Sequence, residues 1–415
     1  MHWLGCVVEH GKLVYACTRF RLEGDPKPMA MNDPAATAFT ATSAGGIPPA
    51  RDDVERLKAY SAPLEGRRGM LRLDFNENTI GPSPKVAEAL RAMPADLFAV
   101  YPEYDGLREA VVANLAATSA GLTHPLTPAH VGVFNGVDAA IHAVLHAYGA
   151  AGDTLLTTSP TFGYYAPCAG MQGMVIEAIP HEMPGFVFPY DGVLEALAKA
   201  PRVLMLCNPN NPTGTRLSAD RVLALAAAAP ATLVVVDELY EAFTGDSVVP
   251  RADFAALPNL LVLRSLAKTA GLAGLRIGFA IGHPDVVDRV SRVTGPYDVN
   301  SLAVTAAFAA LADQPYTDAY VTEVARARNW LVSMLAQSGV RFHVDGGNYL
   351  LLWPTHDVAF VDDALRAAGI LVRSMAGKPQ IDGALRVSLG TTEQMQQFWE
   401  AYRQIEGLVP SPSAP

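Results

Sequence analysis

VLMLCNPNNPTGTRLSADRVLALAAAAPATLVVVDELY, residues 203–240, decides the fold of this chain. Two continuous apolar runs, 203–207 and 232–236, are typical of strands that are buried on both faces of a sheet. The residues between them have helical spacing, and Ser218 stands where an N-cap residue is expected. A strand, a helix and a second strand in this order predict one unit of a parallel sheet.

The same alternation extends in both directions along the chain. Further strands are expected at 131–134, 154–158, 174–179, 260–265 and 277–281. Helices are expected between them, for example at 137–148 and 192–199. The chain is therefore predicted to be an α/β protein whose large domain has a mainly parallel sheet covered on both faces.

The order of expected helices and strands changes after Asn300. Two long helices, about 302–313 and 316–338, precede expected strands at 349–353, 370–373 and 385–389 and a final helix near 393–406. This order predicts a second, smaller α+β domain.

Five parts are expected along the chain. Residues 24–50 are rich in Pro, Gly, Ala, Ser and Thr and lack hydrophobic periodicity, which is typical of linkers and disordered segments. Because Met29 and Met31 lie in this stretch, translation starting there is a further hypothesis. The expected parts are an N-terminal extension (1–53), a segment packing with the small domain (54–100), the large domain (101–300), the small domain (301–408) and a tail (409–415).

Composition excludes several classes of protein. The 31 basic and 41 acidic residues leave a net charge of −10 without a basic run, so the chain lacks the electrostatic footprint of a nucleic-acid-binding protein. Cys6, Cys17, Cys168 and Cys207 are too few and too scattered for a disulfide framework or a zinc cluster. The most apolar stretch, 222–236, is interrupted by Pro230 and is too short to span a bilayer. We expect a cytoplasmic protein without a metal, membrane or nucleic-acid partner.

Chemistry-bearing residues follow several expected strands. In an open parallel sheet, ligands bind beyond the carboxyl ends of the strands. The NPNNPTG loop, Asp237 and Lys268 each follow one such strand, and Gly136 opens a helix after another. Each piece alone could be an ordinary turn, a solvated carboxylate or a loop lysine. Together they bring an amide, a carboxylate and an amine to one edge, facing a helix N-terminus suited to phosphate.

This set of groups matches the requirements of pyridoxal phosphate. The cofactor needs a lysine that binds it covalently and a carboxylate that keeps its pyridine nitrogen protonated. Lys268 and Asp237 supply these groups. It also needs a phosphate cradle of backbone amides, hydroxyls and a cation. The residues available for that cradle are Gly136, Val137, Asp138, Ser265 and Arg276.

Five motifs carry a family resemblance. They are LDFNENTIGPSP (73–84), YPEYDGLR (101–108), NPNNPTG (208–214), VVVDELY (234–240) and SLAKTAGLAGLRIG (265–278). In this order they resemble the fold-type I pyridoxal-phosphate aminotransferases, and within them the histidinol-phosphate aminotransferase branch. The resemblance runs from about Tyr60 to about Ala401. It implies the fold-type I fold, transamination, pyridoxal 5'-phosphate and a homodimer with shared active sites.

The resemblance also implies a role for individual residues at the cofactor. Lys268 matches the Schiff-base lysine that later carries the substrate proton, and Asp237 matches the partner of the pyridine nitrogen. Asn211 and Tyr240 match the pair that hydrogen-bonds the ring oxygen. Phe162 matches the aromatic residue that stacks on the ring.

The remaining implied roles concern phosphate and substrate. Ser265 and Arg276 match phosphate ligands, and Tyr101 matches a tyrosine that reaches the cofactor phosphate of the other subunit. Arg386 matches the arginine that binds the substrate α-carboxylate, a task suited to its planar fork. Arg373 and Tyr60 match positions that contact substrate.

The expected reaction moves an amino group between an amino acid, with glutamate as the first choice, and an oxo acceptor. Histidinol phosphate with 2-oxoglutarate is the first substrate pair. An aromatic amino acid is the alternative substrate, and decarboxylation is an alternative reaction on the same apparatus. A non-catalytic regulator on this fold would carry a DNA-binding domain upstream, and the first 53 residues are too few and not basic enough for one.

Overall fold

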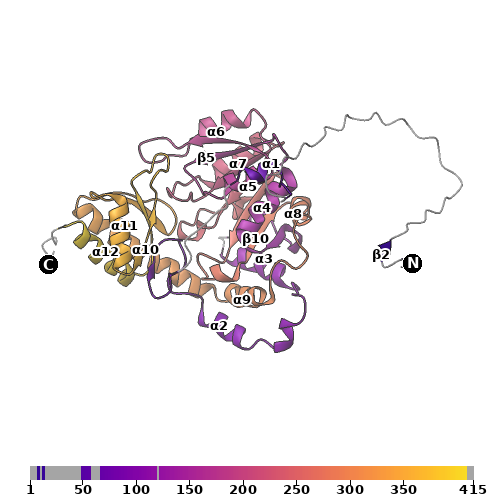
Figure 1. Ribbon diagram of the computed structural model, residues 1–415, viewed down its shortest axis with the longest axis horizontal. Helices are drawn as coiled ribbons and strands as arrows, with labels where there is room; N and C mark the ends of the chain where they lie inside the picture. The colour runs from indigo at the N-terminus through magenta and orange to yellow at the C-terminus, as the bar shows by residue number, and fades with distance from the viewer. Residues whose placement is uncertain (1–6, 10–11, 15–47, 58–65, 119–120, 409–415) are drawn as a thin grey trace. The chain divides into compact units, whose positions relative to one another are not determined.

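The computed structural model describes residues 7–9, 12–14, 48–57, 66–118 and 121–408, and it divides the chain into two units, Met1–Ala50 and Arg51–Pro415 (Figure 1). In the first unit, β1 (Val7–Glu9) pairs antiparallel with β2 (Lys12–Val14). The expectations about Cys6, Cys17, Met29, Met31 and Tyr60 lie outside the described residues.

A seven-stranded sheet forms the centre of the second unit. Its strands are β4 (Val131–Phe134), β5 (Thr154–Ser159), β6 (Val175–Pro180), β7 (Val203–Cys207), β8 (Leu233–Asp237), β9 (Leu260–Ser265) and β10 (Gly278–Gly282). Their order in the sheet is β4-β10-β9-β8-β7-β5-β6. Only the pairings of β10 with β4 and β9 are antiparallel, so the prediction of a mainly parallel sheet is confirmed.

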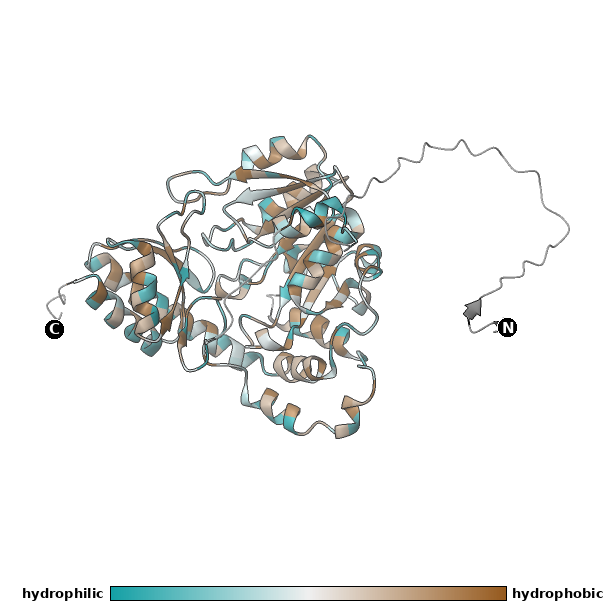
Figure 2. Ribbon diagram, in the orientation of Figure 1, coloured by the Kyte–Doolittle hydropathy of each residue, from teal (hydrophilic) through white to brown (hydrophobic). Residues whose placement is uncertain are grey.

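Helices cover both faces of this sheet. Successive side chains of a strand point to opposite faces, and in the central strands the side chains on both faces are apolar, so both faces have to be covered. In β8, Leu233 and Val235 belong to an apolar cluster with α4 (Gly136–Tyr148), α5 (Tyr165–Met171) and α8 (Pro284–Ser291). Val234 and Val236 belong to a second cluster with helices on the other face. Those helices are α2 (Pro84–Arg91), α3 (Leu107–Thr118), α6 (Tyr190–Leu197), α7 (Ala219–Ala228) and α9 (Ser301–Leu311). The central strands are predominantly hydrophobic (Figure 2).

The helix α7 begins as its sequence predicts. Ser218 is its N-cap, and the Ser218 hydroxyl accepts a hydrogen bond from the amide of Arg221 at 3.4 Å. This bond satisfies one of the amides that the first turn of a helix leaves without a partner. The cap fixes the start of the crossover from β7 to β8.

A four-stranded antiparallel sheet follows. It contains β11 (Arg341–His343), β12 (Tyr349–Trp353), β15 (Leu385–Ser388) and β14 (Arg373–Ser374), in that order. Its apolar face packs against α10 (Gln314–Gln337), α11 (Val358–Ala367) and α12 (Thr392–Ile405).

The expected strand at 370–373 is wrong in one respect. The segment forms two short strands, β13 (Ile370–Leu371) and β14, which belong to different sheets. β13 pairs in parallel with β3 (Leu71–Arg72), which comes from far away in the sequence. A local pattern could not show this division because the partner strand lies about 300 residues earlier.

A small helix, α1 (Asp52–Glu55), belongs to the second unit and packs near α5. No helix within the described ranges is long and apolar enough to cross a membrane.

Candidate active site

The ends of three neighbouring strands assemble the centre of the site. Cys207, the last residue of β7, lies beside Asp237, the last residue of β8. Asp237 in turn lies beside Leu263 of β9. The NPNNPTG loop, Asp237 and the segment containing Lys268 therefore leave the sheet at the same edge, as expected for parallel strands.

Asp237 is a buried carboxylate that lacks a cationic side chain within 4 Å among the described residues. Tyr165 of α5 donates a hydrogen bond of 2.7 Å to its Oδ2, and the amide of Leu239 donates one of 3.3 Å to its Oδ1. Burial raises the pKa of Asp237 to about 7, against the opposing effect of the Tyr165 hydrogen bond. A cation placed beside this carboxylate would favour its ionised form.

The amine of Lys268 is bound by a backbone oxygen. Its Nζ donates a hydrogen bond of 2.9 Å to the carbonyl of Phe75 and lies 5.9 Å from the centroid of the Tyr240 ring. Burial, and then the positive charge of Arg386, lower the pKa of Lys268 to about 8. A neutral amine is therefore accessible near physiological pH, which suits a lysine that attacks a carbonyl group.

Tyr240 and Asn211 are joined directly. The Asn211 side-chain amide donates to the Tyr240 hydroxyl at 3.2 Å, and its oxygen accepts from Arg386 Nη1 at 2.7 Å. Burial raises the pKa of Tyr240, so its hydroxyl keeps its proton at neutral pH. Two expected cofactor residues and one expected substrate residue thus form a single hydrogen-bonded chain.

The N-terminus of α4 forms a cradle. Gly136 has a φ of +78°, and the N-cap Asn135 makes no side-chain capping bond. This backbone conformation favours glycine, and a Cβ there would lie 2.6 Å from Nη2 of Arg276, so the guanidinium lies directly over the start of the helix. The uncapped amides of the helix, together with a guanidinium, make a site for an anion such as phosphate.

The other expected phosphate residues surround this cradle. Arg276 Nη2 donates to Asp138 Oδ2 at 2.8 Å, and both side chains are about half exposed. Val137 is buried, and the Ser265 hydroxyl donates to the carbonyl of Ile277 at 3.2 Å. Asp138 therefore holds the guanidinium of Arg276 at the mouth of the cradle.

Phe162 and Tyr101 lie in contrasting surroundings. Phe162 is partly buried, and its ring packs edge-on against Tyr165 with centroids 5.5 Å apart. Tyr101 is 74% exposed and stacks on Tyr297, with ring centroids 4.4 Å apart. Among the described residues, Tyr101 has no hydrogen bond or ring contact with the other expected site residues.

Arg386 and Arg373 face each other across β15 and β14, as a register pair. Arg386 is 8% exposed and also donates to the carbonyl of Asp74, and its Nε has no hydrogen-bond partner among the described residues. Arg373 is partly buried and lies 5.5 Å above the ring of Phe75. Two guanidinium groups thus lie on one face of the sheet beside the site.

The sequence reasoning missed three residues that contact this site. Tyr165 binds Asp237, and Asn76 donates to the Tyr240 hydroxyl at 3.2 Å. Ser388 binds the side chain of Asn76. A signal for Asn76 was present, because it lies inside the LDFNENTIGPSP motif. Nothing local marks Tyr165 or Ser388, which meet their partners only through tertiary contacts.

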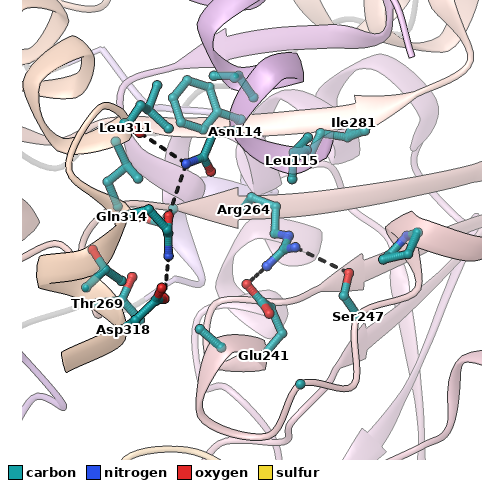
Figure 3. Close-up of a pocket in the computed structure, with 18 of the residues that line it drawn as sticks. Asn114, Leu115, Glu241, Ser247, Arg264, Thr269, Ile281, Leu311, Gln314 and Asp318 are labelled. Carbon is teal, nitrogen blue, oxygen red and sulfur yellow. Dashed lines mark hydrogen bonds and ion pairs between the residues drawn. The ribbon is translucent and has the colours of Figure 1, made fainter. Parts of the chain in front are cut away.

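Figure 3 shows a cavity, with a volume of about 600 Å³, whose lining includes residues adjacent in the chain to site residues. Glu241, Ser265 and Thr269 line it, so it shares backbone segments with Tyr240 and Lys268. Figure 3 shows Arg264 directed toward Glu241 and Ser247. Arg264 and Glu241 of the cavity lining are thus paired with each other.

These residues fit pyridoxal phosphate by their chemistry. The amine of Lys268, the unpaired buried carboxylate of Asp237 and the cradle at Gly136 are the three groups that this cofactor requires. The cradle is the decisive observation, because the first amides of α4 and the guanidinium of Arg276 lie together at Gly136.

Comparisons with known proteins agree with this assignment. The family model "Aminotransferase class I and II" matches residues 68–401. The chain is 32% identical over 370 residues to a histidinol-phosphate aminotransferase of Symbiobacterium thermophilum, an alignment covering 86% of this chain and 98% of the relative. It is 34% identical over 377 residues to one of Roseiflexus castenholzii, covering 86% and 97%.

Solved structures show the same fold. A histidinol-phosphate aminotransferase from Sinorhizobium meliloti, in complex with pyridoxal-5'-phosphate, aligns with a TM-score of 0.77 at 24% identity, covering 88% of this chain and 99% of that one. A Thermus thermophilus aspartate aminotransferase variant aligns with a TM-score of 0.70 at 23% identity, covering 86% and 100%.

The expected fold, cofactor and class of reaction are therefore confirmed. The family match covers most of the chain, and the residues required for pyridoxal phosphate lie within it. The chain belongs to the class I and II aminotransferases, enzymes that depend on pyridoxal phosphate.

Proposed function

We propose that this enzyme is a histidinol-phosphate aminotransferase that uses glutamate and 2-oxoglutarate as its amino acid and oxo acid. The observation that carries the proposal is the pair formed by Arg373 and Arg386 on adjacent strands. The relatives named histidinol-phosphate aminotransferase support the same substrate.

Two like charges in register on one face of a sheet repel each other. Burial and the charge of Arg373 lower the pKa of Arg386. No carboxylate lies within 4 Å of Arg373 in the described part of the chain. Anions bound at Arg373 and Arg386 would relieve this repulsion. The two substrates supply such anions, because histidinol phosphate carries a phosphate and glutamate carries two carboxylates. The phosphate and the α-carboxylate lie at different distances from the amino group that reacts.

The two arginines then have separate tasks. Arg386, already bound to Asn211 beside the cofactor site, would bind the α-carboxylate of glutamate. Arg373 would bind the phosphate of histidinol phosphate, which has no α-carboxylate. We also retain Tyr60 as a proposed substrate contact from the sequence resemblance.

The remaining residues act on the cofactor and on one proton. When bound, pyridoxal phosphate supplies a carbonyl carbon that combines with amines and a ring that accepts an electron pair. Asp237 would keep the ring nitrogen protonated, and Phe162 would cover one face of the ring. Lys268 would hold the cofactor and, after displacement by substrate, accept the α-proton at Nζ.

We also propose a homodimer in which each subunit completes the other's site. Phe98, Val100 and Tyr101 are 65%, 52% and 74% exposed within four residues, and Tyr297, stacked on Tyr101, is 54% exposed. Exposed aromatic side chains so close together support an interface with a second copy. Tyr101 would then contact the partner's cofactor phosphate, together with Arg276 and Ser265 there.

The domain division and location expected from the sequence remain part of the proposal. Residues 101–300 would form a large domain and 301–408 a small one, with the site between them. The two cysteines in the described ranges, Cys168 and Cys207, are buried free thiols, which suits the cytoplasm.

The test is a panel of amino donors mixed with 2-oxoglutarate, with glutamate formation as the measurement. We expect histidinol phosphate to be the best donor and histidinol, which lacks the phosphate, to be far poorer. Faster turnover of phenylalanine or tyrosine would replace the proposal by an aromatic aminotransferase. Carbon dioxide release without an oxo acceptor would replace it by a decarboxylase.

A variant locates the phosphate-binding group. Arg373→Ala should raise the KM for histidinol phosphate by about 10- to 100-fold, since a hydrogen bond to a charged group contributes about 1.5–3 kcal/mol. Arg373→Lys, which keeps the positive charge, is the matched control and should raise the KM for histidinol phosphate by a smaller factor. An unchanged KM for histidinol phosphate in Arg373→Ala would show that Arg373 does not bind the phosphate.

A further inference from the structure

Asn76 has an unusual backbone conformation for a buried residue. Its φ is 54°, in the left-handed region, and it is 1% exposed. Residues other than glycine adopt this conformation rarely, and such residues concentrate at functional sites. Its side chain donates from Nδ2 to the Tyr240 hydroxyl at 3.2 Å.

Ser388 determines which way the Asn76 amide points. The Ser388 hydroxyl accepts from the backbone amide of Asn76 at 2.9 Å and donates to its Oδ1, also at 2.9 Å. Because Oδ1 is used in this way, Nδ2 is the atom directed at Tyr240. All three residues are buried, so water does not compete for these bonds.

Arg386 determines the orientation of Asn211 in the same manner. An arginine cannot accept a hydrogen bond, so the atom of Asn211 that faces Arg386 Nη1 has to be the oxygen. The Asn211 nitrogen then faces Tyr240. The Tyr240 oxygen therefore receives N–H groups from two sides.

We propose that Asn76 is a positioning residue that, together with Asn211, occupies the acceptor positions of the Tyr240 oxygen and so directs the Tyr240 proton toward the ring oxygen of the cofactor. The inference rests on the position proposed for Tyr240 at that oxygen. Asn211 alone would leave one acceptor position open, and the hydroxyl could then rotate. Asn76 thereby links Ser388 of β15 to the hydroxyl beside the cofactor.

The direction of this proton has a measurable consequence. A proton donated to the ring oxygen reduces the negative charge near the nitrogen through which Lys268 binds the cofactor. That nitrogen then loses its own proton at a lower pH. The pH midpoint of the absorption change of the bound cofactor reports this ionisation without any turnover.

Asn76→Gly is the decisive variant, because glycine adopts the same φ without strain and removes only the side chain. We expect the absorption midpoint to rise by about half a unit to one unit of pH, the equivalent of one hydrogen bond. Tyr240→Phe, which removes the hydroxyl itself, should raise the midpoint further. Ser388→Ala, which frees the Asn76 amide to turn, should raise it less.

Asn348→Ala is the matched control. Asn348 donates to the backbone carbonyl of Asn76 at 3.2 Å but does not contact the Tyr240 hydroxyl. This variant should lower the melting temperature and leave the midpoint unchanged. An equal midpoint shift in Asn348→Ala would mean that Asn76 acts only through the stability of its segment, which overturns the inference.

The remaining outcomes separate this inference from the proposed function. A midpoint that moves in Tyr240→Phe but not in Asn76→Gly overturns the inference and leaves the proposed function intact. A midpoint that moves in neither contradicts the position of Tyr240, and the inference falls with it. Should Asn76→Gly not bind the cofactor, an unchanged midpoint in Ser388→Ala overturns the inference instead.

Discussion

Asp237 and Glu238 are neighbours in the chain at the end of β8 and are similarly buried, at 2% and 1% exposed. Their partners belong to opposite faces of the seven-stranded sheet, since Tyr165 lies in one apolar cluster and Val248 in the other. Glu238 accepts from the Ser247 hydroxyl at 2.8 Å and from the Val248 amide at 2.7 Å, and it lies 3.4 Å from Arg264. Within the part of the chain that the structure describes, the carboxylate of Asp237 has only two hydrogen-bond donors, the hydroxyl of Tyr165 and the amide of Leu239.

This difference separates a structural carboxylate from a functional one. Burying a carboxylate is costly unless hydrogen bonds and an opposite charge compensate for it. Burial raises the pKa of both residues, but Arg264 opposes the rise at Glu238. Arg264 compensates Glu238 inside the protein, whereas the charge of Lys268 is the smallest influence on the pKa of Asp237. In the proposed function, the protonated ring nitrogen of pyridoxal phosphate would supply the cation that Asp237 lacks.

The largest expected effect follows Asp237→Asn. Turnover should fall by about 10³-fold or more, because a buried ion pair worth several kcal/mol is lost in the transition state. The apoprotein should become more stable at pH 8. The folded-state pKa of about 7 lies above the unfolded value of 3.8, so ionisation of Asp237 destabilises the fold increasingly between these pH values and fully above them.

Asp237→Asn removes the destabilisation caused by the ionised carboxylate, so the free energy of unfolding of the apoprotein should rise by up to about 4 kcal/mol. Denaturation of both apoproteins between pH 4 and 8 measures the difference. A stability gain that does not grow with pH would contradict the interpretation of Asp237 as an uncompensated charge.

Glu238→Gln should lower the stability of the protein, whereas Asp237→Asn should raise it, and it therefore tests the difference between the two carboxylates. The free energy of unfolding should fall by about 3 kcal/mol, the low end for a broken buried pair, because Glu241 still binds Arg264. Turnover should change little, since Glu238 bonds with Ser247, Val248 and Arg264 and with none of the expected site residues. Urea denaturation and steady-state kinetics are the measurements.

Arg264→Met supplies the control for Glu238. It should destabilise the protein as well, and the double variant should lose less than the sum of the single losses, because both remove the same interaction. Strict additivity would show that Glu238 and Arg264 do not compensate each other.

The smallest effect is expected for Tyr165→Phe. Asp237 then loses its side-chain donor, so its pKa rises above about 7 and its ionised form becomes scarcer. Cofactor affinity at pH 8 should weaken by about tenfold, as for one hydrogen bond to a charged group. Equilibrium dialysis of the apoprotein with pyridoxal phosphate gives this value.

Tyr164→Phe is the matched control for that measurement, because its hydroxyl faces Cys168 rather than Asp237. Its affinity for the cofactor should equal that of the unmodified protein. Equal losses of cofactor affinity in Tyr165→Phe and Tyr164→Phe would show that the Tyr165–Asp237 hydrogen bond does not contribute to cofactor binding.

The local sequence was sufficient to place Lys268, Asp237 and Gly136 at one edge of the sheet. Each follows a strand whose apolar run is visible in the sequence, and parallel strands end at a common edge. The pairing of β13 with β3 was not predictable in this way, because the two strands lie far apart in the chain. Tyr101 could be identified by its motif, but its exposed position beside Tyr297 comes from the folded chain.

The sequence by itself determined the α/β fold, the class of cofactor and the residues that follow each strand, because periodicity and strand ends are local properties. Only the tertiary structure decided which polar groups compensate one another. Arg264 pairs with Glu238, Tyr165 binds Asp237, and Ser388 orients Asn76, each over a separation in the chain that no local pattern records. The physical reason is burial, since a polar group removed from water depends on the partners that folding brings to it.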